Sequence, residues 1–138
     1  MRINKNISYV LTLMLLLVVL SGCSGEDEPG ISRIDWDDHD SRAEQFVTAL
    51  LNGDYTIAAE GFDDEMRRAL GVRGLRNGWR GTVRVAGEFD SMEEAELIAH
   101  DEYEIYHVVT VHNNRNINTR IVFSPDGLIA GLFFSFVD

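Results

Sequence analysis

Two polar side chains, His107 and Arg120, interrupt otherwise apolar alternations and could together bind an anionic or carbonyl ligand. Each lies on a predicted strand, and residues at even spacing along a strand share one face. With Asn114–Arg115 as the turn between the strands, Val122 lies opposite His107 and Val109 lies opposite Arg120. His107 and Arg120 are then diagonal neighbours, within about 7–8 Å. If that face lines a cavity, the imidazole and the guanidinium could orient a ligand. Otherwise the face is partly solvated, or Arg120 pairs with a neighbouring carboxylate.

The sequence contains no motif for catalysis or metal binding. It lacks a Gly-x-Ser-x-Gly nucleophile elbow, a His-Glu-x-x-His pair, a phosphate loop and a dinucleotide fingerprint. His107 and His112 are five residues apart on one strand, so they point to opposite faces and cannot share a metal. The run Asp35–Asp40 holds four carboxylates and His39, but Phe46 stands where an EF-hand loop has its last Glu ligand. We interpret this run as an acidic lead-in to a helix, and we expect no metal and no cofactor.

The one cysteine, Cys23, follows a segment with the features of a secretory signal. Two basic residues precede a largely apolar stretch over residues 7–20, which is shorter than the roughly 20 residues of a transmembrane helix. The ending Leu20-Ser21-Gly22-Cys23 resembles the lipobox of prokaryotic lipoproteins. The resemblance implies cleavage before Cys23, lipidation of its thiol and attachment to the extracytoplasmic face of the membrane. The alternatives are a plain signal peptide and an N-terminal anchor helix with a chance cysteine.

This processing changes the charge of the chain. The 138 residues carry 23 acidic and 12 basic side chains, a net charge of −11. Removal of residues 1–22 takes away Arg2 and Lys5 but no acidic residue, so the net charge becomes −13 and no lysine is left. Such an acidic surface excludes a general nucleic-acid binder. It is typical of proteins from salt-loving organisms, although base-composition bias in a genome also replaces lysine by arginine.

Composition divides the chain into three segments. Residues 1–22 form the signal peptide, residues 23–40 the lipidated N-terminus with an acidic flexible tether, and residues 41–138 the folded domain. The tether is rich in Gly, Ser and charged residues and has no hydrophobic periodicity. About 15 flexible residues span roughly 20 Å, so the tether would hold the domain close to the membrane.

Helical periodicity in the first part of the domain gives way to strand alternation in the second. Ser41 and Glu44 have capping-box spacing at the start of a helix that should end at Gly53. Asp54 and the pair Asp63-Asp64 are N-caps for two further helices, predicted at residues 55–62 and from 65 towards 75. Alternation predicts strands at residues 81–89, 94–100, 102–112, 116–124 and 128–137. The expected fold is α+β, with N-terminal helices packed on a curved antiparallel sheet of four or five strands.

The last predicted strand is apolar on both faces. Alternation places one set of apolar side chains on one face, namely Leu128, Leu132, Phe134 and Phe136. A second set takes the other face, namely Ile129, Phe133 and Val137. Helices can cover one face, so the other needs sheet curvature or a second molecule. We therefore expect the chain to form a homodimer through the sheet.

Several runs carry a family resemblance. The residues from Phe46 to Asp63, with Gly53-Asp54-Tyr55 at their centre, resemble the opening of nuclear-transport-factor-two-like (cystatin-like) cone domains. The chain resembles an uncharacterised extracytoplasmic family of that class more closely. The runs that carry this resemblance are Met66-xxx-Leu70, Leu75-xxx-Trp79, Gly87-x-Phe89 and Val122-Phe123-xx-Asp126-Gly127-x-Ile129-x-Gly131-Leu132. The resemblance covers residues 43–136 and consists mostly of turns, caps and core positions. It implies a secreted or lipid-anchored protein, in a family whose domain often precedes an α/β-hydrolase.

The resemblance leaves more than one function open. We expect a non-catalytic domain that binds a cell-surface partner protein or a small apolar ligand, with Tyr55, Trp79, His107 and Arg120 as candidate contacts; Trp79 alternatively fills the core. The class also includes ketosteroid isomerase and small dehydratases, whose sites need a buried carboxylate base and an oxyanion donor in an apolar cavity. No residue here matches a catalytic motif of that kind. A third possibility is an accessory module for a separate cell-surface hydrolase. A filled core would favour the interaction module over the enzyme.

Overall fold

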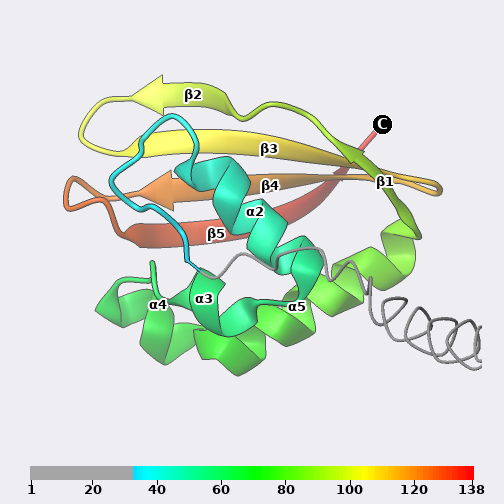
Figure 1. Ribbon diagram of the computed structural model, residues 1–138, viewed down its shortest axis with the longest axis horizontal. Coiled ribbons are helices and arrows are strands. Elements are labelled where there is room, and N and C mark those ends of the chain that lie inside the picture. Colours follow the sequence, from blue (N-terminus) through cyan, green and yellow to red (C-terminus); the bar gives the residue numbers. More distant parts are fainter. Residues whose placement is uncertain (1–32) are drawn as a thin grey trace, which may run out of the picture.

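The computed structural model describes residues 33–138, so the predictions for the signal peptide, Cys23 and residues 24–32 lie outside the described residues. Helices precede strands along this range (Figure 1). The helices are α2 (Arg42–Asn52), α3 (Tyr55–Ala59), α4 (Asp64–Ala69) and α5 (Gly71–Ala86). The strands are β1 (Phe89–Met92), β2 (Glu96–His100), β3 (Glu104–His112), β4 (Asn116–Phe123) and β5 (Ile129–Val137). All strand pairs are antiparallel, which confirms the predicted α+β class.

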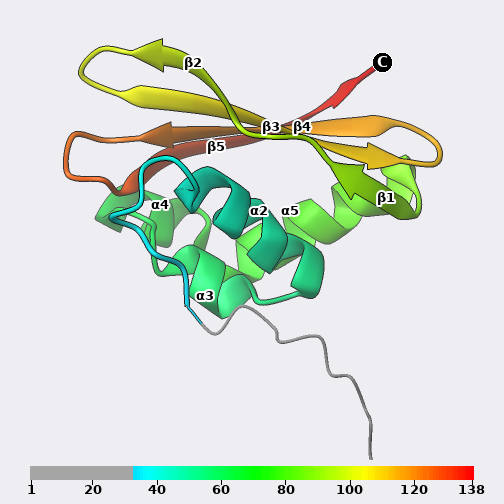
Figure 2. The same ribbon diagram turned by 45° about the horizontal axis from the view of Figure 1, so that its top comes forward.

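The described chain forms two layers, with the helices on one face of an open sheet (Figure 2). The strand order is β1-β3-β4-β5, and β2 also pairs with β3. β1 pairs with the end of β3 near His112, and β2 pairs with its beginning near Glu104. β1 and β2 therefore follow one another along the same edge of the sheet.

Side chains at the helix ends confirm some of the predicted caps and contradict others. Asp54 stands at the N-cap position of α3, but its side chain makes no cap hydrogen bond. The backbone N–H of Gly53 bonds back to α2 with φ 80°, and Asp63 accepts a hydrogen bond from the Met66 N–H at 2.8 Å, as expected of caps. The capping box is wrong. The Ser41 hydroxyl donates to the Asp38 carboxylate, and Glu44 accepts from the Ala95 N–H at 2.8 Å. A local contact has taken Ser41, and a tertiary contact has taken Glu44, away from capping the helix.

The strand predicted at residues 81–89 is also wrong, because α5 continues as a helix to Ala86. The alternation of Val83 and Val85 suggested a strand. However, α5 also has a buried side at helical spacing, on which Leu75 and Trp79 are 0% and 3% exposed. Packing of this buried side outweighs the low helix propensity of the glycines in α5. The helix ends at Gly87, whose φ of 90° suits glycine.

The register of β3 and β4 differs from the predicted one by two residues. His107 lies directly opposite Arg120, instead of diagonally. The turn is centred on Asn113-Asn114, one residue earlier than expected. The side chain of Asn113 accepts a hydrogen bond from the Glu88 N–H, and the Asn114 N–H donates to the Ala86 carbonyl. The end of α5 thus fixes the position of this turn.

The core fills the space between the two layers. Phe46, Leu50, Phe62 and Leu75 from the helical side are at most 1% exposed. The facing side chains on the inner sheet face are 0% exposed and comprise Val108, Ile117, Ile121, Phe123 and Ile129. These core residues and all the elements above come from residues 33–138, so we expect this segment to fold on its own.

Ile129 lies on the opposite face from the one predicted. It is 0% exposed and joins the core together with Leu132, Phe134 and Phe136. The pairing of β4 with β5 shifts between Val122 and Phe123, and such a bulge moves the following side chains to the other face. Phe133 keeps its predicted place on the face away from the helices.

Residues 34–40, assigned to the tether from the sequence, pack against the folded body. Ile34 is 1% exposed and belongs to the core. The Trp36 ring lies directly over Gly61, where a Cβ atom would come within 2.3 Å of the ring. The folded domain therefore extends to Ile34.

Candidate functional site

The sheet face that points away from the helices presents an apolar surface. β3 alternates strictly, with Tyr106 and Val108 buried toward the helices and the intervening residues partly exposed. We call the outward side chains the open sheet face: Ile105, Val109, Val111, Val122, Phe133 and Val137. Phe133 is 59% exposed, whereas the others are half-buried by their neighbours. Among the described residues, no element covers this face (Figure 2).

A polar row crosses the open sheet face. Glu96 pairs with His107, His107 with Arg120, and Arg120 with Phe133, on four neighbouring strands. The Arg120 guanidinium lies 5.9 Å from the centre of the Phe133 ring, at the distance of a cation–π contact. His107 and Arg120 therefore do share a face, as predicted. That face borders solvent and does not line a cavity between the layers.

Tyr55 and Trp79 lie on the other side of the molecule, where they border a groove between the end of α2, α3 and α5. The groove has a volume of about 410 Å³, and Arg80 and Arg84 stand at its rim. Trp79 is 3% exposed and packs on Phe134 at 5.3 Å between ring centres, so most of its ring belongs to the core. The four predicted contacts thus divide between two separate surfaces.

Sequence reasoning missed a third cluster, which is centred on the carboxylate of Glu104. Its side chain is 16% exposed and accepts a hydrogen bond from the Arg42 guanidinium, which is 1% exposed. The Nδ1 atoms of His39 and His100 lie 3.3 and 3.1 Å from the same carboxylate. A pocket of about 320 Å³ borders this cluster. Because Arg42 and His39 lie 62 and 65 positions from Glu104 in the sequence and only His100 is near it, no local pattern could have indicated the whole cluster.

The Glu104 cluster is built as a structural link. The Arg42 guanidinium is held between the carboxylate and the face of Phe123, 4.0 Å from the ring centre, so Glu104 is not free to act as a base. The Tyr106 hydroxyl donates to the His39 carbonyl at 3.1 Å. Burial, followed by the nearby Glu104 charge, raises the pKa of Tyr106. The cluster thereby ties the acidic lead-in and α2 to β3.

Within residues 33–138, no three His, Cys, Asp or Glu side chains are arranged to hold a metal ion. The same part of the chain has no helix of the length and hydropathy needed to span a membrane.

Comparison with known proteins identifies a family. Residues 43–132 match the model of a family described as a protein of unknown function (DUF3887). Neither a curated protein nor a solved structure matches the chain.

Proposed function

We propose that this chain, which belongs to the DUF3887 family, is a membrane-anchored extracytoplasmic lipoprotein whose domain binds a partner protein and catalyses no reaction. The lipobox-like sequence before Cys23 supports the anchor. The order of helices and strands, together with the runs that resemble nuclear-transport-factor-two-like domains, supports assignment to that class.

The observation that carries the proposal is the open sheet face. A monomeric protein rarely exposes a contiguous apolar patch unless the patch binds something. Phe133 is 59% exposed on the edge strand β5, and the half-buried Val122 lies diagonally from it on the neighbouring strand β4. A large aromatic side chain with a neighbouring arginine is typical of the residues that dominate protein interfaces.

The enzymatic alternative, an isomerase or dehydratase of the same fold, has less support. Its base would be a carboxylate in an apolar cavity, with a raised pKa. Among the described residues no Asp or Glu is fully buried, and the partly buried carboxylate of Glu104 is engaged by Arg42. An accessory role for a separate cell-surface hydrolase is compatible with the same binding face.

The partner best suited to the open sheet face is a second copy of this chain. A two-fold dimer is self-complementary, so the polar row of one copy can pair with that of the other in reversed order. Glu96 and Arg120 lie on opposite sides of His107 in this row and provide the opposite charges for such pairing.

Sedimentation velocity of residues 24–138 tests this interface. We expect a dimer for the wild type at tens of micromolar and a monomer for Phe133→Ser. Val85→Ser is the matched control, because Val85 is a 52% exposed apolar residue on α5, in the other layer. A dimer that survives Phe133→Ser, or a wild type that stays monomeric, would contradict self-association through this face.

The anchor is tested separately in bacterial cells. We expect the wild-type chain in the membrane fraction and Cys23→Ala in the soluble extracytoplasmic fraction. A Ser21→Ala variant keeps a small residue two positions before Cys23 and controls for changes in the signal region. Membrane retention of Cys23→Ala would instead support an uncleaved anchor helix.

A further inference from the structure

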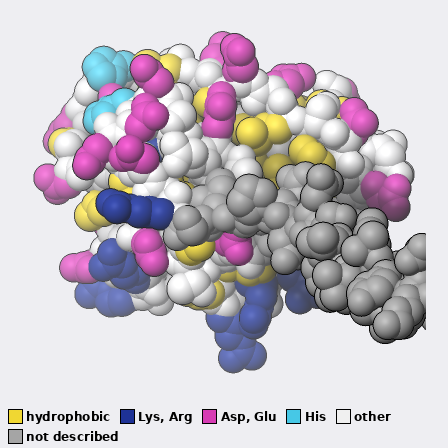
Figure 3. All heavy atoms as spheres, viewed as in Figure 1, with side chains coloured by type: hydrophobic (Ala, Val, Ile, Leu, Met, Phe, Trp, Pro, Cys, Tyr) yellow, Lys and Arg dark blue, Asp and Glu magenta, His cyan; other side chains and the backbone are white. Residues whose placement is uncertain are grey.

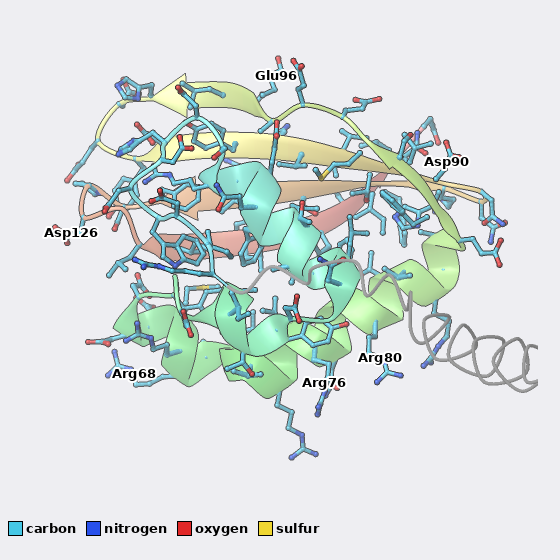
Figure 4. The ribbon with its side chains drawn as sticks, in the orientation of Figure 1. Arg68, Arg76, Arg80, Asp90, Glu96 and Asp126 are labelled. Atoms are coloured by element: carbon cyan, nitrogen blue, oxygen red, sulfur yellow. The ribbon has the colours of Figure 1, made fainter. Side chains whose placement is uncertain are left out.

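α5 presents a row of arginines to solvent. Arg73, Arg76, Arg80 and Arg84 follow one another at spacings of three and four residues, which places them on one side of the helix. All four are exposed, and α5 contains no acidic residue. We call these four residues the arginine row. Figure 4 shows Arg76 and Arg80 pointing away from the sheet.

The arginine row lacks partners within the described part of the chain. No carboxylate there lies within 4.0 Å of any of the four guanidinium groups, in contrast to Arg42 and Arg67, which form ion pairs. Like charges one turn apart destabilise a helix. An external anion would relieve this repulsion, so the row is a candidate binding surface.

The row is also exceptional in a chain with a net charge of −11. Figure 3 shows basic side chains gathered along the helical edge and acidic ones mainly over the opposite part of the visible face. In Figure 4, Arg68, Arg76 and Arg80 lie at the helical edge, whereas Asp90, Glu96 and Asp126 belong to the sheet side and its loops. At physiological ionic strength, charges more than about 8 Å apart are largely screened from one another. The charges close to a surface therefore decide which ligands it attracts more than the net charge of the chain does.

The groove beside the row matches an amphiphile with an anionic head. Arg80 and Arg84 stand at its rim, and Leu51, Tyr55 and Val83 provide an apolar lining. Guanidinium groups bind phosphate oxygens in a bidentate manner. The groove can therefore take a phosphate head group at its rim and the first apolar atoms of a lipid below it.

The described chain begins beside α3, in the same layer as the arginine row (Figures 1 and 2). If Cys23 carries the lipid, as in the proposed function, about ten residues join the anchor to this layer, and ten residues can reach at most about 33–36 Å. The row would then lie within reach of the membrane, and the open sheet face would point away from it.

We propose that the arginine row and the adjoining groove dock on anionic phospholipid head groups of the membrane. The docking orients the domain, so that the open sheet face is presented to partners. This proposal rests on the proposed function only because the anchor would bring the arginine row close to the membrane. The binding itself involves residues of α5 and the groove.

Vesicle co-sedimentation of residues 24–138 tests the docking independently of the anchor, because this segment does not contain Cys23. The vesicles contain either phosphatidylcholine alone or equal parts of phosphatidylcholine and phosphatidylglycerol. We expect binding to the anionic vesicles and roughly 25-fold weaker partitioning for R80Q/R84Q, at about fivefold per arginine. R67Q/R115Q removes the same charge from two exposed positions outside both the arginine row and the open sheet face, and should partition within about twofold of the wild type.

Three results would overturn the docking proposal. Equal losses in the two double variants would mean that net charge alone matters. Equal binding to neutral vesicles would exclude head-group recognition. Binding to a DNA duplex without binding to vesicles would identify a different polyanion. None of these results bears on Cys23 or on Phe133, so the proposed function would stand or fall separately.

Discussion

The guanidinium of Arg42 and the carboxylate of Glu104 form an ion pair that joins α2 to β3 across 62 positions of sequence. Arg42 is 1% exposed, and its other face rests on the Phe123 ring. His39 and His100 contact the same carboxylate from the lead-in and from β2. One side chain of β3 thus holds three segments together.

Loss of one partner in this pair should strongly destabilise the fold. We expect Glu104→Gln to lower the free energy of unfolding by about 3 kcal/mol, because it leaves the buried Arg42 charge uncompensated. The double variant Arg42→Met/Glu104→Gln should lose less than the sum of the two single changes. Urea unfolding of all four proteins measures this coupling, and additive losses would show that the pair does not interact.

Two glycines at the end of α5 should respond in opposite directions to alanine. Gly81 lies inside the helix with open space around it, so Gly81→Ala should stabilise the protein by about 0.5–1 kcal/mol. Gly87 has a φ of 90°, and a Cβ atom there would come within 1.9 Å of the Asn113 side chain. Gly87→Ala should therefore destabilise the protein by more than 1 kcal/mol. Thermal unfolding compares the two, and destabilisation by Gly81→Ala would contradict the helix at that position.

Tyr106 should make the fold sensitive to alkaline pH. Its pKa is raised from 10.0 by burial and by Glu104, so the neutral phenol is favoured in the folded state. The resulting stabilisation is complete below pH 10 and is lost as the pH rises through the higher pKa of the folded protein. Tyr106→Phe should remove this loss, at a cost of about 1 kcal/mol at neutral pH for the missing hydrogen bond.

Unfolding midpoints over a series of alkaline pH values would show this difference. Tyr103→Phe is the control, because that side chain is 45% exposed. An alkaline loss of stability that is the same in Tyr106→Phe and the wild type would assign the effect to other groups.

Salt should stabilise the folded domain. The acidic surface, with a net charge of −11 for the chain, repels itself at low ionic strength, and salt screens this repulsion. We expect the thermal midpoint of residues 24–138 to rise between low and molar NaCl concentrations. An unchanged midpoint would argue against salt adaptation and leave genomic base composition as the reason for the missing lysines.

The sequence predicted the second half of the fold well, because the alternation of β3 and β4 is regular; the bulge between β4 and β5 misplaced only the start of β5 at Ile129. The predicted strands at 102–112, 116–124 and 128–137 match β3, β4 and β5 within two residues at each end. α5 was missed in part because Val83 and Val85 fit a strand as well as a helix. The register of His107 against Arg120 depends on contacts between the end of α5 and the β3–β4 turn, which no local pattern contains.

The candidate surfaces were less predictable than the fold. His107 and Arg120 were placed on one face because the two-residue period fixes sidedness whatever the register. The spacing of three and four residues within the arginine row is visible in the sequence. It was concealed by the assignment of residues 81–89 to a strand, which separated Arg84 from Arg80. The Glu104 cluster depends on its contacts with Arg42 and His39, which are 62 and 65 positions away in the sequence.

The division of one sheet edge between β1 and β2 affects how copies of the chain can assemble. Irregular pairing interrupts both strands, at Phe89/Ser91 and at Leu97/Ala99, and Glu93 and Glu94 stand between them. A broken, charged edge is a poor template for another strand. Copies of the chain are therefore hindered from adding edge to edge into a growing filament, and contact through the broad face of the sheet would close the assembly at two.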